Sequence, residues 1–188
     1  HYFLNHPFQL MEGKSMLHVL VNSIRKKEKN FSWTEELENK TVNQYEIGLK
    51  TFRLFELAQK HYIKGSVEFK GLLTKNNDFS ENELYRVGGF GSLRGFNEES
   101  ITANMYGFAS VDYRFVPSEA FYIGLFSDYG FIDNKRANMN TSILSLGTGI
   151  SFITKMGIFN LSYAVGKTSE TSFDFKESKI HFGILSQF

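Results

Sequence analysis

The residues that can do chemistry are concentrated in the second half of the chain. The stretch from Gly88 to Phe96 reads Gly-Gly-Phe-Gly-Ser-Leu-Arg-Gly-Phe and presents one guanidinium, that of Arg94, on a glycine frame. Asp112 and Asp128 follow it, each within a run that alternates with apolar residues. A planar guanidinium fits a carboxylate through charge-assisted, often bidentate hydrogen bonds. The chemistry favoured here is therefore ion pairing, and we expect Arg94 to bond to Asp128 or Asp112.

Other kinds of chemistry have less support in these residues. The glycine stretch reads G-x-G-x-x-x-G and lacks the Lys-Ser/Thr ending of a phosphate loop, so no nucleotide cofactor is expected. The chain has no Cys, and its five His, at positions 1, 6, 18, 61 and 181, lack the spacing of metal ligands. No Ser or His nucleophile frame and no G-x-S-x-G elbow accompanies the two carboxylates. We expect no catalytic residue, no metal, no cofactor and no enzyme activity.

Composition restricts the class of protein further. The 188 residues are enough for one domain, and a net charge of +1 gives no electrostatic case for binding nucleic acid. With 20 Phe and 9 Tyr but only 2 Pro, the chain is rich in residues that favour strands. No apolar run approaches the roughly 18 residues that a membrane helix requires, and the N-terminus lacks the order of a signal peptide. Strands of a membrane barrel remain compatible with this composition, because their signal is weaker.

Alternation with a period of two predicts strands along most of the chain. The clear runs are 16–24, 45–52, 63–70, 105–115, 121–131, 144–152, 159–166 and 180–188, with 2–12 as a further candidate. One face of these runs is apolar and aromatic, whereas the other mixes Lys, Glu, Asp, Ser and Gly. Asp112 and Asp128 fall on the same mixed face, although not directly opposite each other.

Short and long connections alternate between the predicted strands. Short turns are expected near 12–14, 56–60, 116–119 (with Pro117 at the first corner) and 154–157, and polar loops at 25–40, 73–100, 133–141 and 168–177. Outer-membrane barrels sort their connections in this way, with short periplasmic turns and long external loops. A soluble barrel or sandwich, with the apolar face inside, is the alternative, because alternation alone does not tell which face is which. The sorted loops, with glycine and charge on the mixed face, favour lipid outside and a polar lumen.

Several motifs resemble one family. Arg86-Val87-Gly88-Gly89-Phe90 and Leu93-Arg94-Gly95-Phe96 resemble the arginine-glycine-aromatic motif in the sixth extracellular loop of the BamA/TamA superfamily of outer-membrane assembly and translocation barrels. The runs 110–115 and 126–130 resemble the next two strands, with Asp112 and Asp128 as their acidic residues. Phe182 and Ile184 before the terminal Phe188 are similar to a C-terminal β-signal. The resemblance covers residues 57–188 well and 1–56 loosely.

The resemblance implies an all-β fold with one domain over residues 1–188. This domain is an antiparallel transmembrane β-barrel, whose about eight or nine strands are the C-terminal half of a barrel of about sixteen. A loop over about residues 73–100 is implied to fold into the lumen and to be anchored there by Gly88, Gly89, Leu93, Arg94, Gly95 and Phe96, with Asp112 and Asp128 as acidic partners. We expect the glycines, Gly91 included, to pack against the wall. A barrel of only eight strands is filled by its own side chains and leaves no room for such a loop.

The function implied by the resemblance is insertion, assembly or translocation of other proteins at the bacterial outer membrane, with the C-terminus on the periplasmic side. The expected partners are membrane lipid, client polypeptides and lipoprotein or periplasmic accessory subunits. Two alternatives remain: a passive porin-like or polypeptide-export channel with the loop as a plug, and a structural barrel that partners lipoproteins. Crosslinking of clients to the final strand favours the first function, and ion conductance without client contact favours the channel.

Overall fold

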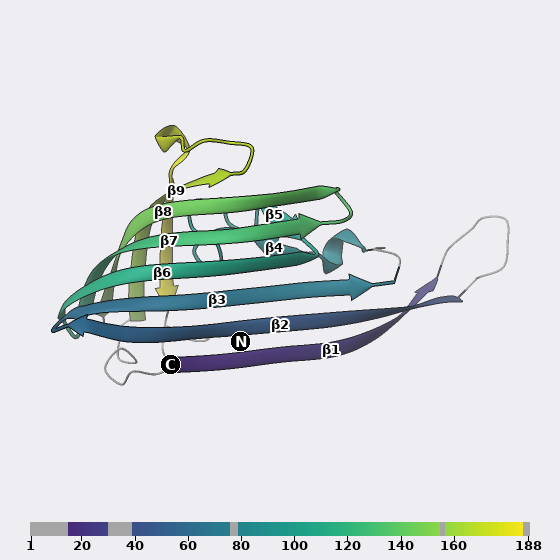
Figure 1. Cartoon of the computed structure of the whole chain (residues 1–188), viewed down its shortest axis with the longest axis horizontal. Helices are drawn as coiled ribbons and strands as arrows, with labels where there is room; N and C mark the ends of the chain where they lie inside the picture. The colour runs from purple at the N-terminus through teal and green to yellow at the C-terminus, as the bar shows by residue number, and fades with distance from the viewer. Residues whose placement is uncertain (1–14, 30–38, 76–78, 155–156, 186–188) are drawn as a thin grey trace.

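Eight antiparallel strands form one curved sheet (Figure 1). The computed structural model describes residues 15–29, 39–75, 79–154 and 157–185. The strands of the sheet are β1 (Ser15–Lys29), β2 (Asn39–Ala58), β3 (His61–Thr74), β6 (Met105–Ser118), β7 (Phe121–Asn134), β8 (Met139–Thr154), β9 (Gly157–Thr168) and β10 (Lys179–Leu185). They pair in chain order, and within the described residues no ladder joins β1 to β10, so the sheet is an open wall.

The connection from β3 to β6 leaves the sheet and lies within its curve (Figure 1). It contains a 3-10 turn, η2 (Glu81–Glu83), and two short strands, β4 (Tyr85–Val87) and β5 (Ile101–Ala103), that pair with each other. We call residues 79–104 the inward loop. A second 3-10 turn, η3 (Phe175–Glu177), lies in the connection between β9 and β10.

The two faces of the sheet differ in chemistry. Large apolar side chains are exposed on the outer face, with Leu125 at 62% and Val111 at 54%. Polar and charged side chains are buried on the inner face, among them Lys64, Asp112 and Asp128. A water-soluble protein rarely exposes so continuous an apolar surface, whereas a barrel in lipid requires it. The predicted all-β transmembrane wall, with apolar residues outside and polar residues inside, is confirmed.

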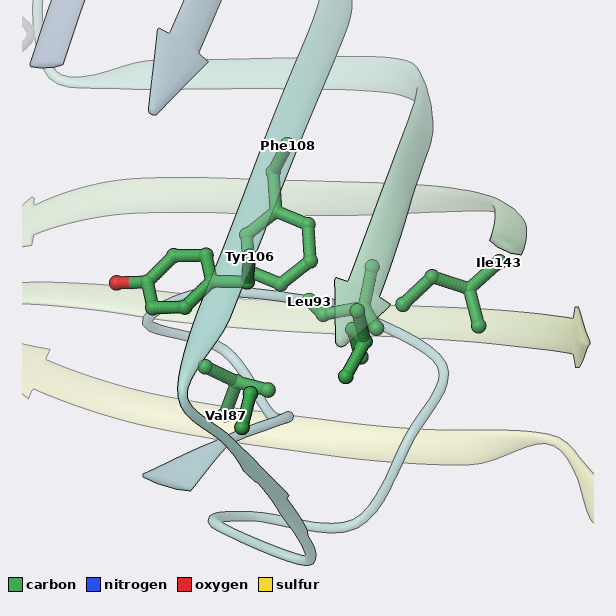
Figure 2. Close-up of a cluster of buried hydrophobic side chains, with 7 residues drawn as sticks. Val87, Leu93, Tyr106, Phe108 and Ile143 are labelled. Carbon is green, nitrogen blue, oxygen red and sulfur yellow. The ribbon is translucent and has the colours of Figure 1, made fainter. Parts of the chain in front are cut away.

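The inner face also carries an apolar cluster that the inward loop covers (Figure 2). Val87, Leu93 and Ala103 of the loop pack on inward side chains of the wall, which are Tyr106, Phe108, Ile132 and Ile143. Leu93 and Ile132 are completely shielded from solvent. Burying a side chain of this size is worth about 1.5–3 kcal/mol. This packing gives the loop a fixed position before any polar contact is considered.

Two expected loops are shorter in the structure than in the sequence analysis. The loop predicted at 25–40 was wrong at both ends, because β1 continues to Lys29 and β2 begins at Asn39. The loop predicted at 133–141 shrinks to four residues, 135–138. A tilted strand crosses the bilayer in about 9–11 residues, and beyond it both faces meet water. The charged pairs of residues 25–29 with 39–43 need no alternation beyond that length, so the sequence pattern alone predicts a loop there. Asp133 and Asn134 read as a loop for another reason: they are polar residues buried against the inward loop, where Asn134 donates to the Thr102 carbonyl.

The turn predicted at 116–119 is also displaced. Pro117 lies within β6, where the pairing with β7 shifts register between Phe115 and Ser118, and the turn itself is formed by Glu119 and Ala120. Proline has no N–H for a ladder, so a register shift at a strand end accommodates it. The strand at 2–12, the turn at 12–14 and Phe188 lie outside the described residues.

The assignment of the faces predicts the cost of a charge on the outer surface. Leu125→Lys should destabilise the folded barrel by about 2–4 kcal/mol, because the ammonium would replace an exposed apolar side chain near the middle of β7. The volume-conserving Leu125→Met should cost less than about 1.5 kcal/mol. Urea titration of folding into liposomes measures both. Equal stability of the Lys and Met variants would mean that this face does not contact lipid.

Candidate functional site

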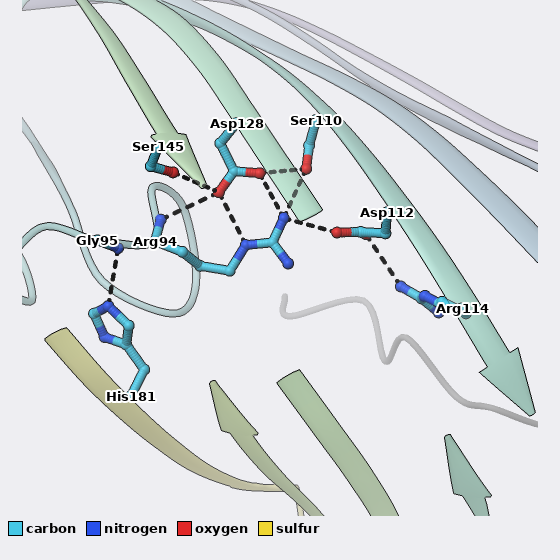
Figure 3. Close-up of polar contacts among 8 residues, drawn as sticks. All are labelled: Arg94, Gly95, Ser110, Asp112, Arg114, Asp128, Ser145 and His181. Atoms are coloured by element: carbon cyan, nitrogen blue, oxygen red, sulfur yellow. Dashed lines mark hydrogen bonds and ion pairs between the residues drawn. The ribbon is translucent and has the colours of Figure 1, made fainter. Parts of the chain in front are cut away.

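A tight turn at the tip of the inward loop projects Arg94 toward the wall. The N–H of Gly89 donates to the carbonyl of Leu93 at 2.9 Å, and the Ser92 hydroxyl bonds to the backbone of Gly88. Leu93 is held in the apolar cluster, and the next residue, Arg94, points toward Asp128 and Asp112 (Figure 3). Two consecutive residues of the turn therefore attach the loop in different ways, Leu93 by apolar packing and Arg94 by its charge.

The Arg94 guanidinium is bound by both predicted carboxylates (Figure 3). Its Nε donates to Asp128 Oδ2 at 2.9 Å, and its Nη2 donates to Oδ1 of the same carboxylate, a bidentate arrangement. The backbone N–H of Arg94 also donates to Asp128 Oδ2, at 3.3 Å. Nη2 lies 2.8 Å from Asp112 Oδ1 and donates to the Ser110 hydroxyl at 2.8 Å.

The strand register brings these groups together. Asp128 of β7 pairs with Ser110 of β6 on one side and with Ser145 of β8 on the other, and both hydroxyls donate to its carboxylate. Asp112 is paired with Phe126, so the two carboxylates are diagonal neighbours. The centroid of the Phe126 ring is 3.5 Å from the Arg94 Cζ, a cation–π contact.

Burial makes this ion pair a strong constraint. The side chains of Arg94 and Asp128 are 18% and 3% exposed. Burial alone would lower the pKa of Arg94, but the hydrogen bond to Asp128 and the charges of Asp112 and Asp128 outweigh it and raise that pKa. Asp112 has a second cation, Arg114, whose Nη2 lies 3.3 Å from its Oδ2. Two guanidinium groups thus face two carboxylates on the inner wall.

Residues after Arg94 fit the loop into β9 and β10. Gly95 has a left-handed φ of 89°, and a Cβ there would lie 2.9 Å from the backbone nitrogen of Gly166, so only glycine fits. The Phe96 ring occupies the space over Gly166, and the Phe90 ring lies over Gly183. The Gly95 N–H donates to Nε2 of His181 at 3.1 Å.

The remaining glycines of the motif have other roles than expected. Gly88 and Gly89 face their own loop, since a Cβ would meet the carbonyl oxygen of Asn97 at the first and the Glu98 carboxylate at the second. A Cβ at Gly91 would meet nothing within 4 Å. Of the four glycines expected to pack on the wall, Gly95 alone does so.

A second set of contacts holds the other limb of the loop to β2. The Tyr85 hydroxyl donates to Glu46 Oε1 at 2.9 Å, and Gln44 Nε2 donates to Glu83 Oε2 at 3.1 Å. Burial and the neighbouring Glu46 carboxylate raise the pKa of Tyr85, so its hydroxyl stays protonated as the donor. The loop is thus held to the wall from β2 to β10.

The structure brings together Arg94, Asp112 and Asp128, and places Leu93, Gly95 and Phe96 beside them. Phe182 and Ile184 lie apart from this site, on the exposed outer face of β10. Sequence reasoning missed Ser110, Phe126, Ser145 and His181 as parts of the site. All four residues lie on the mixed face of their strands, and this was the signal in the sequence that could have found them. The contact between Gly95 and His181 had no local signal, because it joins residues 86 positions apart.

Neither a metal centre nor a helical span is found in the part of the chain that the structure describes. No group of three or more His, Cys, Asp or Glu there could hold a metal ion. No helix among those residues is long and apolar enough to cross a membrane.

An open wall of antiparallel strands, apolar outside and polar inside, with a loop ion-paired to its inner face, defines the class of transmembrane β-barrel proteins with an inward-folded loop. A family model described as the Omp85 superfamily domain matches residues 28–188, and the chain belongs to this superfamily. No curated protein matches the chain. Omp85 proteins are associated with the outer membrane, where they insert or translocate client polypeptides. They generally work with accessory subunits, and as a family they are non-enzymatic.

The ion-pair geometry predicts how the loop responds to substitution. Arg94→Ala should weaken docking of the loop by up to about 3–5 kcal/mol, because Asp128 is left buried without its cation. Arg94→Lys should restore docking only in part, since a point charge cannot replace the bidentate fork. Asp128→Asn should weaken docking more than Asp112→Asn, because Asp128 takes most of the bonds. The rate of proteolysis within residues 79–104 of the folded barrel measures docking.

Arg86→Ala is the matched control, because Arg86 lies on β4 of the same loop and is exposed. The control should be cleaved at the wild-type rate while the barrel remains folded. Cleavage of Arg94→Ala at that same rate would contradict an anchoring role.

Proposed function

We propose that this protein assists the insertion or translocation of other polypeptides at the bacterial outer membrane, with the inward loop anchored in the lumen through Arg94. Client strands pair along the free edge of β10. The loop end of the wall faces the outside, and the turn end, with the C-terminus, faces the periplasm. Lipoprotein or periplasmic subunits assist at the turn end.

The observation that carries this proposal is the edge of β10. In the described part of the sheet, β10 is hydrogen-bonded to β9 alone. Backbone N–H and C=O groups left unpaired in hydrocarbon cost several kcal/mol each, so this edge requires a partner strand. A strand of the same barrel that is held weakly there can be exchanged for a client strand, which is β-augmentation in a membrane.

The inward loop supports the same reading. It contacts the last two strands through Gly95, Phe96 and Phe90, so it stiffens the wall next to the edge where clients pair. A simple plug would need to fill the lumen but would need no specific fit to β9 and β10. The passive channel is therefore the less favoured function.

Crosslinking tests where clients pair. The chain has no Cys, so Ile180→Cys on the outer face of β10 introduces a single thiol beside the free edge. It should form disulfides with single-Cys clients during their assembly. Ile123→Cys, also on the outer face but on β7 in the interior of the sheet, is the control and should not form them. Equal crosslinking at both positions, or ion conductance without any client crosslink, would overturn the proposal in favour of a passive channel.

The C-terminal residues give a separate prediction. If Phe182, Ile184 and Phe188 form a β-signal, Phe188→Ala should lower the amount of this protein in the outer membrane without changing the stability of the folded copies. Phe175→Ala is the control, because Phe175 is an exposed aromatic residue (71%) in the β9–β10 connection, outside the proposed signal. Quantifying heat-modifiable barrel in membrane fractions measures assembly. Wild-type assembly of Phe188→Ala would leave Phe188 as an ordinary residue of the barrel.

A further inference from the structure

The bond between Gly95 and His181 joins the tip of the inward loop to β10, and it depends on a proton. The Gly95 N–H donates to Nε2 of His181, and His181 is 8% exposed. A ring nitrogen accepts a hydrogen bond only when it carries no proton, so the imidazole is neutral and holds its proton on Nδ1. We propose that His181 is a positioning residue that holds the loop tip on β10 in its neutral form and releases it when protonated.

The geometry leaves no way for a protonated ring to keep this contact. Both nitrogens of an imidazolium are donors, so Nε2–H would point at the Gly95 N–H. Gly95 cannot rotate to present its carbonyl, because its left-handed backbone already lies against Gly166 and Ser145. Protonation therefore turns this bond into a repulsion between two N–H groups and weakens docking of the tip on β9 and β10. Phe96 and Phe90, which lie over Gly166 and Gly183, belong to the same docked surface.

The charges around His181 do not compensate for the lost bond. The charged groups that act on it are Arg94 and Glu98 of the loop and Lys179 of its own strand. On β9, its register partner is the uncharged Ser162. The Asp128 carboxylate of β7 is already bound by the Arg94 guanidinium. The Glu98 carboxylate near the ring is thus opposed by two cations.

Around its tip, the loop therefore has two polar attachments to the wall with different responses to pH. The pairing of Arg94 with Asp128 joins it to β6–β8, and a guanidinium stays charged throughout the accessible pH range. The His181 bond joins it to β10 and is lost as pH falls through the range in which histidine titrates. Since release takes up one proton, the docking constant of the tip falls by up to about tenfold per pH unit below the midpoint. This device does not depend on whether clients pair with β10.

Gly91 provides a site for a reporter. Gly91 is exposed, its φ is not in the left-handed region, and a Cβ there meets nothing within 4 Å. Gly91→Cys, in a chain without other Cys, carries a single nitroxide label. Electron paramagnetic resonance of the full barrel in liposomes then reports the mobility of the tip between pH 8 and pH 5.5. The immobile fraction should be high at pH 8 and should fall with pH.

Two further variants assign the effect. His181→Gln should keep the label immobile over the whole range, because an amide oxygen accepts from Gly95 at any pH. His61→Gln, which changes an outer-face histidine that contacts the Tyr113 hydroxyl, should leave the pH dependence unchanged. A label whose mobility does not change with pH, or a pH dependence that survives His181→Gln, would overturn the proposal.

A measurement on the unsubstituted ring covers the case in which His181→Gln does not fold. Nitrogen NMR of His181 should show Nε2 without a proton at pH 8, and its protonation should share the midpoint of the mobility change. A proton on Nε2 at pH 8 would overturn the proposal directly.

Discussion

The ion pair between Arg94 and Asp128 is the constraint on which the inner side of the wall depends. A guanidinium cannot be neutralised by losing its proton, so it can be buried only where carboxylates and hydroxyls surround it. Asp128 must then point inward from β7, and its two neighbours in register are serines, which donate to it without competing for space. The position of one loop residue thus determines side chains on three strands.

The glycines of the wall leave the space that the loop needs to reach this position. A loop that brings Arg94 this deep must also place its backbone and Phe96 against β9, and Gly166 has no side chain to prevent it. Phe90 fits over Gly183 in the same way. Small residues on the wall and aromatic residues on the loop form one packed surface, so neither set would be needed without the other.

Local patterns predicted the strands, their order and the inward parity of Asp112 and Asp128. A period of two is imposed on every residue that has lipid on one side and a lumen on the other, so the pattern is strong within the bilayer. It is lost at the polar ends of strands. There the charged sequence 25–29 and the buried Asp133 and Asn134, which face the inward loop, lack an apolar face. His181 could not be assigned from sequence, because its partner is a backbone N–H whose position depends on the fold of the whole loop. The ion pair was foreseeable from residue chemistry, whereas Ser110 and Ser145 followed only from the register.

The lengths of β1 and β2 have a consequence for the rim of the barrel. β2 has 20 residues, about twice what a tilted strand needs to cross a bilayer, and Figure 1 shows the β1–β2 hairpin reaching beyond the neighbouring strands. The overhanging part is a two-stranded stalk in which residues 25–29 pair with 39–43, beyond the end of the ladder between β2 and β3. Its height can therefore change by pairs of residues, one from each strand, without disturbing a single contact in lipid or lumen. A change of length there would alter the rim and leave the wall beneath it the same.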